Sequence, residues 1–238
     1  MLTDLYNENC IKVLQEMDEE SIDLIVSDPP YKMTSRGNSG NAGGMIKKKE
    51  VNSGNVFEFN DTPVTEWAKE FYRVLKDGSH CYIMTNHVNL IEFLNVLTDV
   101  GFHFVKSLIW MKDNKIMGHS YMSQFEYVLF FRKGSFKKIN NCGTSDIMQF
   151  DNNKLKDPNG GNLHDTEKPV DLLEALIGNS SNEGDIVMDP FMGIGSAGIA
   201  SKKLERNFIG CELDKKYFKV ATDRIHNTIL VDDLFEEE

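Results

Sequence analysis

The sequence predicts an α/β domain with a largely parallel β-sheet covered by helices on both faces. Two observations support this prediction: segments with the pattern of strands and of helices alternate along the chain, and its 238 residues, 40% of them hydrophobic, are enough to bury one core. The segment 22–26 has the apolar pattern that is typical of a strand buried in a parallel sheet. Because such sheets bind ligands at the carboxyl ends of their strands, the residues that follow each strand are the first candidates for function.

The expected elements follow one another in chain order. Apolar residues at helical spacing predict a first helix over residues 11–17, and the apolar run at 22–26 predicts the strand after it. Pro63 opens a second helix, which we expect Gly78 to end. The later strands are expected at 81–85, 102–110, 125–132, 186–189 and 208–212, and the later helices at 90–97, 170–177, 196–204 and from Tyr217 onward.

Composition and charge exclude several classes of protein. The net charge of -11 means that a nucleic-acid partner must be held by a local basic patch. No stretch approaches the roughly 18 apolar residues of a membrane span, and the first residues lack the pattern of a secretory signal, so we expect a cytoplasmic protein without a membrane partner. The four cysteines lie far apart without a CxxC pair, which argues against a zinc site and a disulfide framework, and we expect no metal.

Two polar intervals interrupt the alternation of strands and helices. Residues 33–60 are rich in Gly and Asn, and residues 133–167 are rich in Lys, Asn and Gly. Both are longer than ordinary connections, which favours either a functional insertion or a mobile, solvated loop. The pattern alone leaves both alternatives open.

A glycine-rich stretch indicates a nucleoside site. Gly193, Gly195 and Gly198 spell GxGxxG between an expected strand and an expected helix, which allows close approach of the backbone to a bound group. Glu212 ends the next strand, where an acid can accept hydrogen bonds from both hydroxyls of a ribose. The chain after Gly198 is too short for the second half of a dinucleotide-binding domain, so the expected ligand is an adenosine derivative other than a dinucleotide.

The stretch SDPPYK, directly after the strand 22–26, indicates chemistry on an amine. A stiff Asp-Pro-Pro turn holds the Asp28 carboxylate and the Pro29 carbonyl as fixed acceptors, and Tyr31 offers a face on which a planar base can stack. Such acceptors stabilise the positive charge that develops on an exocyclic amine as it attacks a methyl group. The methyl donor that fits the ribose-binding Glu212 is S-adenosylmethionine.

These motifs stand in the order of one family. Besides DPPY followed by FMGIG, the similar parts are Asn9-Cys10, YRVLKDG at 72–78, TNH at 85–87, LIWMK at 108–112, FEYVLFFRKG at 125–134, HDTEKP at 164–169 and FIGCELD at 208–214. The chain therefore resembles the amino-methylating DNA methyltransferases of the permuted β class. The resemblance implies a Rossmann-like S-adenosylmethionine-dependent methyltransferase fold with a seven-stranded, mostly parallel sheet and a circularly permuted motif order, in one domain over 1–238. It also implies a target base flipped out of the DNA.

The resemblance assigns roles to individual residues. Asp28, Pro29 and Pro30 are expected to hold the target amine, and Tyr31 to stack on its ring. His164 is expected to be structural, because this chemistry needs no histidine. The cofactor-binding residues that the resemblance implies are Asn9, Cys10, Asp28, Thr166, Lys168, Asp189, Phe191, Gly193, Gly195, Ser196 and Glu212.

Five positions depart from the family pattern. Asn9 stands where an acid is usual, and it is still expected to pair with adenine through its carbonyl oxygen. Asp165 replaces a proline. The usual Ser-Thr-Thr is replaced by Ile194, Ser196 and Ala197.

The two polar intervals are expected to recognise double-stranded DNA. Phosphate contacts need cations, and the expected basic surface consists of Lys47, Lys48, Lys49, Arg132, Lys133, Lys137 and Lys138. A cognate restriction endonuclease and a homodimer are further partners compatible with the resemblance.

The expected function is site-specific methylation of adenine N6 in DNA. Asp at the head of DPPY favours adenine, whereas family members with Ser there favour cytosine N4, so a cytosine-N4 methyltransferase is the first alternative. A catalytically inactive module that binds cofactor and DNA is the second. A nicotinamide-dependent oxidoreductase, suggested by GxGxxG alone, is the third.

Overall fold

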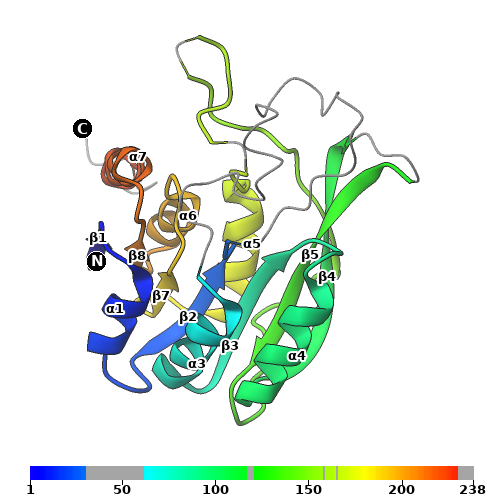
Figure 1. The fold of residues 1–238 in the computed structure, drawn as a ribbon, viewed down its shortest axis with the longest axis vertical. Coiled ribbons are helices and arrows are strands. Elements are labelled where there is room, and N and C mark those ends of the chain that lie inside the picture. The colour runs from blue at the N-terminus through cyan, green and yellow to red at the C-terminus, as the bar shows by residue number, and fades with distance from the viewer. Residues whose placement is uncertain (31–61, 117–120, 158, 165, 230–238) are drawn as a thin grey trace, which may run out of the picture.

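The computed structural model describes residues 1–30, 62–116, 121–157, 159–164 and 166–229 (Figure 1). Eight strands form one sheet in the order β1-β8-β7-β2-β3-β5-β4-β6. The strands are β1 (Thr3–Tyr6), β2 (Ile22–Ser27), β3 (Leu75–Thr85), β4 (His103–Ile116), β5 (Ser123–Arg132), β6 (Ile147–Gln149), β7 (Ile186–Asp189) and β8 (Asn207–Cys211). The helices are α1 (Cys10–Glu16), α3 (Val64–Val74), α4 (Leu90–Val100), α5 (Val170–Ser180), α6 (Ser196–Lys203) and α7 (Lys215–His226).

Most neighbouring strands in the sheet run parallel. The five strands from β1 to β3 pair in parallel, and β5 pairs antiparallel with both β3 and β4. At the far edge β6 pairs in parallel with β4. Figure 1 shows β1 near α1 and α7 at one side of the molecule and β4 with β5 at the other. The carboxyl ends of β2, β7 and β8 therefore lie next to one another at one edge of the sheet.

Helices cover both faces of the sheet, as the alternating pattern predicts. One apolar cluster joins α1, α3 and α4 to one face and includes the fully buried Trp67. A second cluster joins α5, α6 and α7 to the other face and includes the fully buried Leu176. Consecutive residues of β2 supply opposite faces: Ile25 belongs to the first cluster, and Leu24 and Val26 belong to the second. This two-sided burial explains why Leu24, Ile25 and Val26 of β2 are all apolar.

The boundary between α3 and β3 differs from the prediction. The helix ends at Val74, and Gly78 lies inside β3 with a φ of 75° instead of ending the helix. Leu75 already has extended backbone angles, is fully buried, and pairs with Ile22 of β2. The gain from extending the buried sheet therefore outweighs the helical pattern of the sequence at this point.

Two strands were not expected from the sequence, and the sheet has eight strands rather than the implied seven. β1 has only half-buried and exposed residues, so its pattern carries no apolar run. β6 is a three-residue edge strand within the polar interval 133–167, fixed by its pairing with β4 and by the buried Met148. Such a short strand has too few residues for a recognisable alternation.

Part of the interval 133–167 is docked on the protein and is not a solvated loop. The backbone N–H of Asn140 donates to the Asn179 carbonyl at 2.7 Å. The Asn140 side-chain amide donates to the carbonyls of Gly178 at 2.9 Å and Ser181 at 2.8 Å, which satisfies the end of α5. The other interval, 33–60, lies outside the described residues. Of the helices in the described ranges, none has the length and apolar character needed to cross a membrane.

The third glycine of GxGxxG serves helix packing. Gly198 lies in α6, where a Cβ would come within 2.3 Å of Ile225 Cδ1 and 2.8 Å of Phe208 Cε1. The absence of a side chain at this position lets α6 approach both α7 and β8.

We expect Gly198→Ala to lower the free energy of unfolding by about 1–3 kcal/mol, because the added methyl group overpacks this contact. Urea unfolding followed by circular dichroism measures the change. Gly178→Ala, in α5, is the matched control, since its Cβ would lie at an ordinary 3.9 Å from Leu204 Cδ1, and alanine is the better helix former. Equal losses in the two variants would contradict the packing role of Gly198.

Candidate functional site

A cavity of about 370 Å³ opens at the carboxyl ends of β2, β7 and β8. The last residues of these strands, Ser27, Asp189 and Cys211, all line it. The structure brings together in its wall most of the residues that the sequence assigns to the site. They are Asn9, Cys10, Asp28, Pro29, Pro30, Thr166, Lys168, Asp189, Phe191, Gly193, Ser196 and Glu212.

Gly195 is one expected cofactor residue that does not line the cavity. It is the N-cap of α6 with a φ of 85°, and a Cβ there would lie 3.0 Å from both Ala221 and Ile225 of α7. Its conformation and its close contact with α7 explain the glycine without a ligand. Tyr31 and the lysines Lys47, Lys48 and Lys49 lie outside the described residues.

The other four expected DNA-binding residues lie away from the cavity. They are Arg132, Lys133, Lys137 and Lys138. Arg132 pairs with His80, five residues before the end of β3, and the Lys133 ammonium donates to the Leu75 carbonyl at 2.7 Å. This is the amino end of β3, whereas Asp28 follows the carboxyl end of β2. The antiparallel direction of β5 carries these cations to the opposite edge of the sheet, so the structure does not place them beside the expected target base.

The buried carboxyl group of Asp189 and the half-buried one of Glu212 both line the cavity. Asp189 Oδ1 accepts hydrogen bonds from Ser27 Oγ at 3.0 Å and from the Phe191 N–H at 3.1 Å, and Glu212 Oε1 accepts one from the Asp214 N–H at 2.7 Å. Burial raises the pKa of Asp189 to about 7, and burial together with nearby Asp214 raises the pKa of Glu212 to about 7. The raised pKa values mean that the protein itself compensates these negative charges poorly.

The cavity fits the cofactor that the sequence implies. S-adenosylmethionine carries ribose hydroxyl donors and two positive charges, at its sulfonium and its ammonium. Poorly compensated carboxyl groups such as Asp189 and Glu212 are the partners that such a ligand requires. The wall between them is lined by the backbone of Gly193, where a Cβ would lie 3.5 Å from His164 Nε2.

The structure changes the expectation for Asn9. Its carbonyl oxygen caps α1 by accepting the Ile11 N–H at 2.8 Å, so this oxygen already has a partner within the chain. Its neighbour Cys10 is buried, and burial raises the pKa of that thiol to about 12, which keeps it neutral. The sequence pattern predicts the position of both residues but not the capping role of Asn9.

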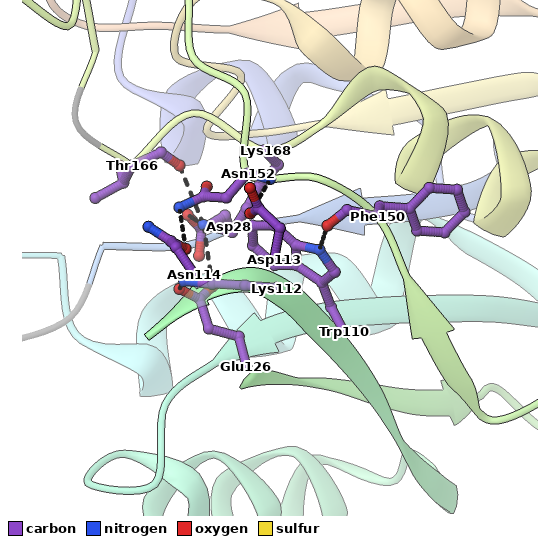
Figure 2. Close-up of polar contacts among 10 residues, drawn as sticks. All are labelled: Asp28, Trp110, Lys112, Asp113, Asn114, Glu126, Phe150, Asn152, Thr166 and Lys168. Atoms are coloured by element: carbon purple, nitrogen blue, oxygen red, sulfur yellow. Dashed lines mark hydrogen bonds and ion pairs between the residues drawn. The ribbon is translucent and has the colours of Figure 1, made fainter. Parts of the chain in front are cut away.

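A line of alternating charges leads away from Asp28 (Figure 2). Asp28 Oδ2 forms an ion pair with the Lys168 ammonium, which also donates to the Thr166 carbonyl at 3.2 Å. Lys168 Nζ lies 3.6 Å from Glu126 Oε2, and the other oxygen of Glu126, Oε1, pairs with Lys112 Nζ. Asp28 Oδ1 is buried and has no hydrogen-bond partner among the described residues.

The charges in this line act on one another. Burial raises the pKa of Asp28, against the opposing effect of Lys168. Burial also acts to raise the pKa of Glu126, but Lys168 and Lys112 outweigh it, and the pKa of Glu126 is lowered. Glu126 is therefore held as a carboxylate between two ammonium groups.

Sequence reasoning gave no role to several of these residues. Lys112 and Glu126 occur in similar segments of the family, and the signal that could have identified them is a charged residue within an apolar strand. Glu167 accepts from Arg224 at 2.8 Å and from the Leu155 N–H at 2.7 Å, which connects the polar interval to α7.

His164, expected to be structural, lies in the wall of the cavity. Its ring contacts Tyr217 edge to face, with 4.6 Å between the ring centroids. Tyr217 itself lines the cavity. The pair therefore forms part of the cavity wall.

The chain is similar to known DNA methylases in sequence and in fold. A family profile described as DNA methylase, of the N6 and N4 type, matches residues 22–223. Type II methyltransferase M2.DpnII of Streptococcus pneumoniae is 31% identical over 239 residues, which cover 93% of this chain and 88% of the relative.

Two solved structures show that the fold is shared. M1.HpyAVI in complex with SAM is 24% identical with a TM-score of 0.68, and the match covers 94% of this chain and 100% of that chain. The PvuII DNA methyltransferase, described as cytosine-N4-specific, is 18% identical with a TM-score of 0.75, and the match covers 96% of this chain and 88% of that chain. The expected methyltransferase fold is confirmed.

The raised pKa values predict how stability depends on pH without cofactor. Glu212 has a pKa of about 7 in the folded protein against 4.5 as its ordinary value, so the folded state binds this proton more tightly. The resulting stabilisation is fully present below the ordinary pKa and is lost as pH rises through about 7. Between pH 5 and pH 8 we expect Glu212→Gln to lose less stability than the wild type, by on the order of 1–3 kcal/mol.

Urea unfolding at the two pH values measures this difference. Glu183→Gln, at an exposed acid outside the cavity, is the control and should follow the wild type. Identical pH dependence in the wild type and Glu212→Gln would contradict the assignment of the raised pKa to Glu212.

Proposed function

The chain belongs to the DNA methylases of the N6 and N4 type and is therefore an S-adenosylmethionine-dependent DNA methyltransferase, and on this premise we propose that it methylates adenine N6 in double-stranded DNA. Membership in this family argues against the alternative function of a nicotinamide-dependent oxidoreductase. Relatives are named type II methyltransferases, and we extend to this chain their site-specific action on DNA. A cognate restriction endonuclease and a homodimer stay predictions.

One observation supports the proposed chemistry above the others. Asp28 Oδ1 is a buried acceptor without a hydrogen-bond partner among the described residues, and it lies in the wall of the cavity at the end of β2. A buried carboxylate oxygen without a partner is costly unless a ligand supplies a donor. The exocyclic amine of a flipped base supplies two such donors.

Different residues of the cavity wall would contact the cofactor and the target base. Glu212 would hold the ribose hydroxyls, and Asp189 would face the positively charged methionine part. When bound, S-adenosylmethionine supplies an electrophilic methyl group on a sulfonium sulfur, whose bond to that carbon breaks as the amine nitrogen bonds to it. Phe191 and Pro29 line the cavity and would exclude water from the bound ligands.

Asp28 acts on the amine in two ways. Its unpartnered Oδ1 accepts a hydrogen from the amine, which orients the nitrogen lone pair toward the methyl group. As the nitrogen bonds to carbon it becomes positive, and the nearby carboxylate stabilises this charge. The surplus proton on the nitrogen then passes to Asp28, which leaves a neutral methylated amine.

The choice of adenine rests on the sequence. Asp28 heads the DPPY motif, and an acid at this position favours adenine in the family that the chain resembles. Stacking on Tyr31 and phosphate contacts from Lys47, Lys48 and Lys49 stay predictions, because these residues lie outside the described ranges. Base stacking of this kind contributes roughly 1–3 kcal/mol, which partly offsets the cost of flipping the base.

We expect the purified protein with S-adenosylmethionine to form N6-methyladenine in unmethylated genomic DNA, and Asp28→Ala to lower the rate at least 100-fold, because it removes the acceptor for the amine. A nucleoside digest analysed by mass spectrometry measures both. Cofactor affinity of the variant, measured by calorimetry, controls for folding.

The outcomes separate the candidate functions. N4-methylcytosine would contradict the choice of adenine and keep the mechanism. Cofactor binding without any methylated nucleoside would contradict the proposed enzymatic activity and favour an inactive module. An active Asp28→Ala variant would contradict the role of Asp28.

A further inference from the structure

Four charged groups near the cavity alternate in sign. Lys112 from β4, Glu126 from β5, Lys168 before α5 and Asp28 after β2 point toward one another in Figure 2. The side chains of Lys112 and Lys168 are only 5% and 8% exposed. A buried ammonium group without an anion is strongly destabilising, so each lysine depends on the carboxylates beside it.

Lys168 lies near two carboxylates, those of Asp28 and Glu126, but it is hydrogen-bonded only to Asp28 of the two. Its ammonium is hydrogen-bonded to Asp28 Oδ2, whereas Glu126 Oε2 lies 3.6 Å away. Glu126 Oε2 is buried and has no hydrogen-bond partner within the part of the chain that the structure describes. A movement of about 1 Å would bring Lys168 into hydrogen-bond distance of this oxygen.

Lys112 keeps the second carboxylate available. It binds Glu126 through Oε1, and its ammonium also lies 4.7 Å from the centre of the Trp110 ring. Because Lys112 occupies Oε1, the carboxylate stays charged while Oε2 points toward Lys168. Trp110 is itself fixed, since its indole N–H donates to the Phe150 carbonyl at 3.0 Å (Figure 2).

The proposed reaction places a second positive charge beside Asp28, and Glu126 offers Lys168 another anion. The amine becomes positive against one oxygen of Asp28 while Lys168 is positive against the other. Two like charges on one carboxylate repel each other, and Lys168 also makes Asp28 a weaker acceptor for the surplus proton. An alternative anion for Lys168 removes both effects.

We propose, on the premise of the function above, that Glu126 is a positioning residue that receives the Lys168 ammonium from Asp28 when the target amine engages Asp28. Glu126 does not touch either ligand in this role. It acts through Lys168, and its effect is to let Asp28 stabilise the positive amine and accept its proton.

The charged groups that face Asp28 determine the expected effect of pH. They are Lys168, Lys112, Glu126 and Asp189. Of these, Glu126 acts to raise the pKa of Asp28 and the two lysines act to lower it. Removal of the Glu126 charge therefore leaves Lys168 on Asp28 and lowers the pKa of Asp28.

The test is Glu126→Gln, assayed under single turnover with unmethylated genomic DNA and enzyme in excess. We expect the rate constant of methyl transfer to fall about tenfold to a hundredfold, with cofactor affinity unchanged and the acidic limb of the rate-pH profile moved to lower pH. A purely structural role would lower stability or cofactor affinity and leave that limb in place. Glu126→Asp should recover part of the rate, because it restores the anion.

Two further variants make the result decisive. Glu174→Gln breaks another Lys–Glu ion pair, Lys203 Nζ to Glu174 Oε1 at 2.7 Å between α5 and α6, and should match the wild type. The double variant Lys112→Met/Glu126→Gln removes one charge of each sign, so it tests the role of Glu126 even if the single variant does not fold, and it should lose the same rate.

An unchanged rate and pH profile in a folded variant without Glu126 would overturn the inference while leaving the proposed function intact. A wild type that forms no methylated nucleoside would overturn the proposed function, and this inference with it.

Discussion

The parallel pairing of β2 with β7 is the constraint on which the site depends. Leu24 and Ile25 pair with Val187 and Met188, so both strands end at the same edge of the sheet, about 4.8 Å apart. Asp28, which follows β2, and Asp189, which ends β7, are thereby brought together although they are 161 residues apart in the chain. Ser27, the neighbour of Asp28, fixes their separation through its hydrogen bond to Asp189. In the proposed function, Asp189 faces the cofactor and Asp28 holds the amine, and the parallel pairing of β2 with β7 is what places these two residues beside the same cavity.

Features that depend on local pattern could be predicted, and features that depend on partners distant in sequence could not. Apolar runs identified the strands that are buried on both faces, such as β2 and β7, and the DPPY and FMGIG motifs identified part of the cavity wall. The sequence could not show that Leu75 would pair with Ile22 in place of continuing a helix, because helix and strand compete there for the same apolar residues. β6 was missed since only its pairing with β4 makes it a strand.

The roles of charged residues are where the predictions from sequence and the structure differ most. A lysine in a polar interval suggests a DNA contact, but Lys133 contacts other parts of the fold. Its ammonium donates to the Leu75 carbonyl, forms an ion pair with Glu20 at 3.3 Å, and lies 5.0 Å from the centre of the Tyr72 ring. Lys112 shows the opposite case: it is a charged residue inside a strand, and it forms an ion pair with Glu126, close to Lys168 and Asp28. The side chain's neighbours, not its type, decide whether a cation serves folding or function, and those neighbours come from other strands.

The segment between Leu155 and Leu163 closes on itself at its base, where the Leu163 N–H donates to the Leu155 carbonyl at 2.8 Å. It is tied to the wall of the cavity through the Leu155 N–H, which donates to Glu167, the neighbour of Lys168 in the chain. Because the base is closed by this hydrogen bond, a substitution at an exposed position such as Asn159 leaves the backbone contact that joins the segment to Glu167 in place. The segment can therefore tolerate sequence change without altering the ion pair of Lys168 with Asp28.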